Sequence, residues 1–149
     1  MTYDSTEDTL QHIRRVQELL NAFAAELIRR GKIHDRSKLG QVEKPARDAH
    51  PPNYEHRYGE PQERSAALRA AFIHHHSVNS HHPEFYGDRG VSGMDLADLV
   101  EMFFDWKAAG EPFKYDTIGS SLEINSTRFN LAPQLVAIFK NTADRLEPD

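Results

Sequence analysis

Hydrophobic residues in the first part of the chain recur with the period of a helix. Between residues 6 and 30 they follow one another at three- and four-residue steps, which is the spacing of one buried stripe. The stripe consists of Leu10, Ile13, Val16, Leu20, Phe23 and Leu27. Asp8 or Thr9 can cap the start of this helix, and Gly31 can end it. His12 lies beside the stripe, so we expect its imidazole to point toward the interior.

Four later segments carry helical signals as well. Alanine-rich composition favours a helix over residues 63–79, and a proline at position 133 suits the first turn of a last helix. Two further helices are predicted over 94–109, with a stripe of Leu96, Phe103 and Trp106, and over 117–129, with Ile118, Leu122 and Phe129 near the core and Ser121, Asn125 and Arg128 on a polar face. Sustained period-two alternation is absent. The predicted fold class is therefore all-α, with one domain over residues 1–149 and about five to seven helices.

Prolines and glycines mark the segments between these helices. Residues 42–61 hold four prolines and a glycine, a density that predicts a long surface loop or short helical pieces. His50 and His56 fall in this stretch and are expected on the surface. Residues 80–93 hold one proline and three glycines and are predicted to form a loop.

Composition and charge narrow the class of protein. A length of 149 residues, with 38% hydrophobic and 28% charged residues, is typical of one soluble domain. The net charge of −5 argues against a protein dedicated to duplex DNA, and the lack of cysteine excludes disulfides and thiolate metal sites. The apolar runs are too short to cross a bilayer, and the first eight residues are acidic, unlike a signal peptide. We expect a cytoplasmic protein without a membrane partner.

Histidine is the residue type that points to chemistry. Five of the nine histidines lie between positions 74 and 82, and histidine is the commonest metal ligand in proteins. His74 and His75 are the strongest candidates for a functional role, followed by His82 and His81, and His76 is the weakest. The alternative is that these side chains only cap the end of a helix.

A second set of donors is spread over three predicted elements. His12, His34, Asp35 and Asp98 offer the imidazole and carboxylate ligands that a divalent cation needs. Glu101 and Asp105 fall on the same helix face as Asp98, so they either belong to the site or pair with basic residues such as Lys107.

At these residues the chain resembles the HD-domain superfamily of metal-dependent phosphohydrolases. His34-Asp35-Arg36-Ser37-Lys38-Leu39 is similar to the His-Asp-x-Gly-Lys signature, with Ser37 where glycine is usual. His74-His75 with Asn79 is similar to the paired histidines of a branch that holds extra metal ions. The whole chain also looks like a small family of phages and bacteria. That likeness rests on the His-Asp-x-Ser-Lys-Leu motif, on His-His-Pro-Glu at 81–84, on Glu-Met-x-x-Asp-Trp-Lys-Ala at 101–108 and on Arg-Phe at 128–129.

The resemblance implies an activity and roles for individual residues. The activity would be hydrolysis of a phosphate ester, with a nucleotide as the leading substrate, by one or two divalent ions such as Mn, Co, Fe, Zn or Mg. The implied metal ligands are His12, His34, Asp35, Asp98, His74, His75 and His82. The implied catalytic residues are Asp35, Lys38, His74 and His75, and the substrate contacts are Arg14, Lys38, Asn79, His81, Glu101, Asp105 and Arg128.

Two other functions fit the same sequence. One is a di-iron oxygenase on the same scaffold, and the other is a non-catalytic protein that binds a metal or a nucleotide. In each case the expected partner is a small molecule. The domain can also form a homodimer, because small helical domains often associate in this way.

Overall fold

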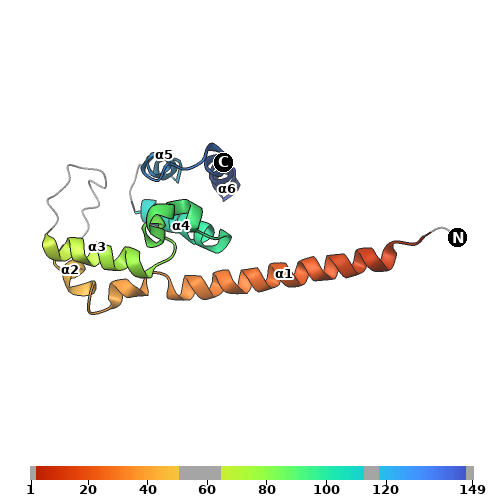
Figure 1. Ribbon diagram of the computed structural model, residues 1–149, viewed down its shortest axis with the longest axis horizontal. Coiled ribbons are helices and arrows are strands. Elements are labelled where there is room, and N and C mark those ends of the chain that lie inside the picture. The colour runs from red at the N-terminus through yellow and green to blue at the C-terminus, as the bar shows by residue number, and fades with distance from the viewer. Residues whose placement is uncertain (1–2, 51–64, 113–117, 147–149) are drawn as a thin grey trace. The chain divides into compact units, whose positions relative to one another are not determined.

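The computed structural model describes residues 3–50, 65–112 and 118–146. Within these ranges the chain is helical and holds no strand, which confirms the predicted all-α class (Figure 1). The α-helices are α1 (Thr6–Ile33), α2 (Lys44–Asp48), α3 (Ala66–Val78), α4 (Leu96–Gly110), α5 (Ile118–Arg128) and α6 (Pro133–Leu146), and the 3-10 helices are η1 (Arg36–Leu39) and η2 (Pro83–Gly93). The chain divides into two compact units, residues 1–34 and residues 35–149.

The first unit contains α1, the longest helix of the chain at 28 residues. It continues to Ile33, two residues past the glycine that was expected to end it. Within this unit none of the helix residues is buried, and His12 lies on its exposed surface. Across the described parts of the chain, no helix combines the length and apolar character that a membrane crossing requires.

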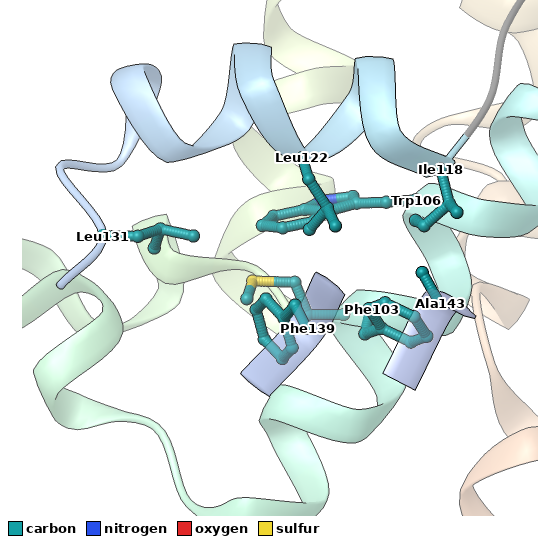
Figure 2. Close-up of a cluster of buried hydrophobic side chains, with 8 residues drawn as sticks. Phe103, Trp106, Ile118, Leu122, Leu131, Phe139 and Ala143 are labelled. Atoms are coloured by element: carbon teal, nitrogen blue, oxygen red, sulfur yellow. The ribbon is translucent and has the colours of Figure 1, made fainter. Parts of the chain in front are cut away.

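The second unit has its hydrophobic core where α4 and α6 meet the intervening α5 (Figure 2). The core consists of Met102, Phe103, Trp106, Ile118, Leu122, Leu131, Phe139 and Ala143. Trp106 stacks on Phe129 with ring centroids 6.0 Å apart, and Phe103 lies 5.4 Å from Phe139. These contacts fix α4, which carries two acidic residues of the site described below.

Two positions of the predicted stripes differ from the structure. Leu96 is 64% exposed, because it is the first residue of α4 and lies beyond the packed part of the helix. Ser121 was expected on a polar face, yet it is fully buried beside Leu122 in the core. A small hydroxyl side chain can fit into a buried position. A pattern that divides residues only into polar and apolar does not predict this.

The segments rich in proline and glycine hold more helix than the sequence predicts. Residues 80–93 contain η2 where a loop was expected, although Gly87 and Gly90 interrupt it with φ angles of +56° and +48°. The short helix α2 begins with a proline in its first turn and agrees with the expected helical pieces. Residues 51–64, including His56, lie outside the described residues, as do 113–117.

Replacement of a core leucine tests the packing of α4, α5 and α6. We expect Leu122→Ala to lower the free energy of unfolding by about 2–5 kcal/mol, because it removes a fully buried side chain and leaves a cavity. Leu96→Ala is the matched control, since Leu96 is mostly exposed, and should change it by less than about 0.5 kcal/mol. Urea unfolding followed by circular dichroism measures both, and equal losses would contradict this core.

Candidate metal centre

Four side chains of the second unit bring their ligand atoms together. They are Asp35, His75, His81 and His82, and one ligand atom of each lies within 4.8 Å of the others. Asp35 Oδ1 is 3.1 Å from His75 Nε2 and 3.4 Å from His81 Nε2. His75 Nε2 is in turn 2.9 Å from His82 Nε2. Below, these four residues are called the primary cluster.

A tight turn after α3 brings the three histidines together. His75 is buried in the last turn of α3, and the helix ends at Val78. Asn79 leaves the helical conformation and donates from Nδ2 to the His75 carbonyl at 2.7 Å, while its own carbonyl accepts from the His82 backbone at 3.2 Å. The chain therefore folds back at once, and His81 and His82 return to the ring of His75.

Asp35 reaches the primary cluster from an unusual backbone conformation. It caps η1 with a left-handed φ of +56°, which aspartate adopts more readily than most residues. Its Oδ2 pairs with Lys38 Nζ one turn later. Because the lysine holds Oδ2, the other oxygen Oδ1 faces His75 and His81.

The spacing of the ligand atoms fits a bound divalent ion. Nitrogen and oxygen ligands lie about 2.0–2.2 Å from such an ion, so neighbouring ligand atoms are roughly 3.0–3.5 Å apart in tetrahedral or octahedral geometry. Three of the six distances between these ligand atoms are 2.9, 3.1 and 3.4 Å, and all six are within 4.8 Å. Three imidazoles and one carboxylate are also a donor set that Zn, Co, Mn and Fe accept.

Two further carboxylates orient the histidine ligands from behind. The Glu43 side chain is fully buried, with Oε2 3.1 Å from His75 Nδ1. Glu101 Oε1 lies 3.2 Å from His81 Nδ1. Because a carboxylate accepts hydrogen bonds, Glu101 favours the His81 tautomer with its proton on Nδ1, which leaves the Nε2 lone pair for a metal. His75 Nδ1 also has Ser37 Oγ at 3.0 Å and Asn79 Nδ2 at 3.1 Å, so several polar groups fix the orientation of this ring. This carboxylate–histidine pairing is typical of metal centres.

The electrostatics of the primary cluster favour a cation. Burial raises the pKa of Asp35, but the contacts of its carboxylate with His75, His81 and Lys38 outweigh burial, so this pKa lies well below its usual range. Burial and the neighbouring imidazoles lower the pKa of His82 to about 3, which keeps this ring neutral at pH 7. The pKa of His81 is raised, because its bonds to Asp35 and Glu101 outweigh burial. A metal ion can take the place of the positive charge that these carboxylates favour on His81.

The structure brings together only part of the predicted ligand set. Asp35, His75 and His82 were predicted as ligands and lie in the primary cluster. His81 was predicted to contact substrate, but its Nε2 lies among the ligand atoms. His74 lies outside the cluster and directs Nδ1 to Glu43 Oε1 at 2.9 Å, because adjacent residues on a helix point about 100° apart.

Asp98 does not join the primary cluster, contrary to the prediction that it is a metal ligand. Its Oδ1 accepts a hydrogen bond from Ser80 Oγ at 2.7 Å, and its Oδ2 accepts one from Tyr86 and one from the backbone of Asp95. Asp95 in turn accepts from the backbone of Asp98, which completes a capping box at the start of α4. Burial and this carboxylate raise the pKa of Tyr86 to about 12. Asp98 is therefore a structural residue.

The residues predicted to bind substrate have different surroundings. Lys38 and Glu101 lie against primary-cluster residues, and the charge of Asp105 contributes to the raised pKa of His81. Asn79 stabilises the turn between the histidines and donates to Ser37 Oγ at 2.9 Å, which is a positioning role. Arg128 pairs with Glu84 at 2.8 Å.

Three predicted residues belong to the first unit. Arg14 is exposed on α1 and pairs with Glu7 at 3.2 Å. His12 is exposed on the same helix, and His34 is half-buried where α1 ends. Their roles in metal or substrate binding stay predictions.

Sequence reasoning missed Glu43, the residue that holds His75 in place. It belongs to no periodic pattern and lies two residues before a proline, in a stretch that was predicted to form a loop or short helical pieces. Its side chain also pairs with Arg47, at 3.1 Å, and with His74, so one buried carboxylate links α2 to two histidines of α3. A long-range contact of this kind leaves no local signal in one sequence.

Removal of the charge on Glu43 tests its positioning role. We expect Glu43→Gln to weaken the binding of Zn²⁺ or Mn²⁺ about 10- to 100-fold, because His75 loses the buried carboxylate that lies 3.1 Å from its Nδ1 and helps to hold its ring. Glu123→Gln, on the exposed surface of α5, is the control and should bind the ion as the wild type does. Isothermal titration calorimetry measures both, and unchanged affinity in Glu43→Gln would remove this residue from the site.

Comparison with known proteins gives one match. The family model of DUF5662, described as a family of unknown function, matches residues 1–145. No curated protein and no solved structure matches the chain. The side chains themselves must therefore indicate the function.

Proposed function

Since the chain belongs to DUF5662, a family of unknown function, we propose from its side chains that it is a metal-dependent hydrolase of phosphate esters. The observation that carries this proposal is the convergence of Asp35 Oδ1 with the Nε2 atoms of His75, His81 and His82. The resemblance to the HD-domain superfamily stays a prediction, and it adds the substrate class, with a nucleotide as the leading candidate.

The donor set suits the chemistry of phosphate-ester hydrolysis. A divalent ion held by these residues supplies a water of lowered pKa and offsets negative charge on the phosphoryl oxygens. The carboxylates of Glu43, which is buried, and of Glu101, which is 14% exposed, lie against the Nδ1 atoms of His75 and His81 and hold these rings in place. The Asp35 Oδ1 and His81 Nε2 atoms are buried, while the Asp35 side chain as a whole is 15% exposed and His82 is half-buried.

Lys38 is the residue we assign to the reacting phosphate. Its Nζ pairs with Asp35, and 36% of its side chain is exposed, so the ammonium group lies where the site meets solvent. From there it can bind a non-bridging phosphate oxygen or give a proton to the leaving oxygen. Both roles involve the substrate and not the metal ion. Metal binding therefore depends on Asp35 and the histidines and not on Lys38.

A second candidate function follows from the number of ligands. Four protein donors are enough to close a tetrahedral site, and closed sites are typical of structural rather than catalytic metals. In that case the chain binds a metal without turnover. A di-iron oxygenase stays a third possibility, because imidazoles and carboxylates also hold iron.

Metal analysis and activity assays on the purified protein distinguish these functions. We expect at least one transition-metal ion per chain by elemental analysis, and hydrolysis of bis-p-nitrophenyl phosphate or of nucleotides that EDTA abolishes and Mn²⁺ or Co²⁺ restores. Bound metal without turnover of any phosphate ester would favour the non-catalytic function. Iron with a visible absorption band and oxygen consumption would favour the oxygenase. Protein that binds none of Mn, Co, Fe or Zn would refute the proposal.

A further inference from the structure

A second group of metal-ligand side chains lies directly beside the primary cluster. It consists of His76, His82 and Glu84, whose ligand atoms lie within 4.8 Å of one another. The rings of His76 and His82 have centroids 4.8 Å apart, and His76 Nδ1 is 3.8 Å from Glu84 Oε1. We propose, resting on the proposed function, that these three side chains bind a second divalent cation next to the first.

In this second group, the distance between His76 and Glu84 is closer to that between two ligands of one ion than to that of a hydrogen-bonded ion pair. At 3.8 Å, His76 and Glu84 are too far apart for a hydrogen bond. A shift of a few tenths of an ångström brings them to the roughly 3.0–3.5 Å expected of neighbouring ligands. Their side chains are 24% and 33% exposed, so ions can enter from solvent.

His82 belongs to both groups, and this determines the type of the first site. When His82 serves the first ion, that ion has four protein ligands and can form a closed tetrahedral site. When His82 serves the second ion, the first keeps Asp35, His75 and His81. Three protein ligands with an open position are typical of catalytic metal sites. The second cation therefore opens the first site to water and substrate.

Binding of the second cation also affects the ion pair between Arg128 and Glu84. Arg128 Nη2 lies 2.8 Å from Glu84 Oε1, the same oxygen that faces His76. A cation bound to that oxygen competes with the guanidinium and releases it. Arg128 also lies over the ring of Phe129, 4.6 Å from its centroid, a contact that does not depend on Glu84. A released arginine can bind an anionic group of the substrate in bidentate fashion.

Metal stoichiometry of the full chain tests this inference. After equilibrium dialysis against Mn²⁺, we expect two ions per chain in the wild type and one in His76→Ala and in Glu84→Gln. His50→Ala is the matched control, because His50 is exposed just beyond α2 and, among the described residues, its ring contacts the Ala46 carbonyl, so this variant should retain two ions. The electron paramagnetic resonance spectrum should show two coupled Mn²⁺ ions in the wild type and an uncoupled ion in the two variants.

The outcomes separate this inference from the proposed function. One ion in the wild type, or two ions in both variants, would overturn the second site and leave the proposed function standing. No ion in the wild type would refute both. Thermal unfolding of the metal-free proteins shows whether each variant folds. The partial exposure of His76 and Glu84 predicts melting temperatures like that of His50→Ala.

Discussion

Replacement of Asp35 by asparagine should remove the metal and the activity together. We expect Asp35→Asn to bind Mn²⁺ or Zn²⁺ at least about 100-fold more weakly, since a neutral amide replaces the one carboxylate among three imidazoles. Hydrolysis should fall to background at metal concentrations that saturate the wild type. Asparagine keeps the shape of the side chain and tolerates the left-handed φ of +56°, so the turn before η1 can form. Elemental analysis and a phosphate-release assay on the same preparation measure both losses.

Asp48→Asn is the matched control for this variant. Asp48 pairs with Lys44 at 2.7 Å, as Asp35 pairs with Lys38, but it is exposed on α2 and lies outside the metal-ligand groups. We expect it to bind metal and hydrolyse substrate as the wild type does. If Asp35→Asn retained full metal content, the ion would have to bind elsewhere, and the proposed centre would be wrong.

The part of this site that is formed by residues close together in the chain can be predicted from the sequence, because it depends on their spacing. His75 and His82 are seven residues apart, across a turn that Asn79 makes, and the cluster of histidines predicts a metal site there. Asp35 was found from its motif with Ser37 and Lys38, which form the 3-10 turn that follows it. The all-α class also follows from local information, since amphipathic periodicity and helix ends are properties of short segments.

The parts that the sequence did not reveal depend on contacts between distant segments. Glu43 reaches His74 and His75, 31 and 32 positions away, and a single sequence carries no sign of that pairing. Asp98 shows the opposite error. Its place in a helix suggested a metal ligand, but its position at the start of α4 makes it a partner of the capping residue Asp95. A carboxylate in the first turn of a helix is well placed to accept hydrogen bonds from backbone N–H groups, and the position of Asp98 there indicates this capping role.

The choice between His74 and His75 was also open in the sequence. Adjacent helical residues point about 100° apart, so only one of them can face a given ion from one side. Which one does so is decided by the packing of α3 against η1, where Ser37 Oγ lies 3.0 Å from His75 Nδ1. No pattern within α3 contains this information, because it belongs to a tertiary contact.

Replacement of Lys38 separates substrate chemistry from metal binding. We expect Lys38→Ala to keep its metal content and to lose about 100- to 1,000-fold in kcat, because the ammonium group acts on the phosphate and not on the ion. Its loss leaves the Asp35 carboxylate without the cation on Oδ2, while Oδ1 still faces His75 and His81. Metal analysis and steady-state kinetics with bis-p-nitrophenyl phosphate measure the two effects separately.

Lys44→Ala serves as the control for this variant and should leave kcat unchanged. Lys44 has the same kind of partner, an aspartate on its own segment, but its side chain is 53% exposed on α2. The comparison distinguishes a reaction role from a general loss of positive charge. A leaving group of low pKa needs little protonation, so a defect that shrinks with such substrates would identify Lys38 as the proton donor. An equal defect with every leaving group would instead assign the lysine to binding the phosphate oxygens. Full activity of Lys38→Ala with both kinds of substrate would exclude this residue from the reaction.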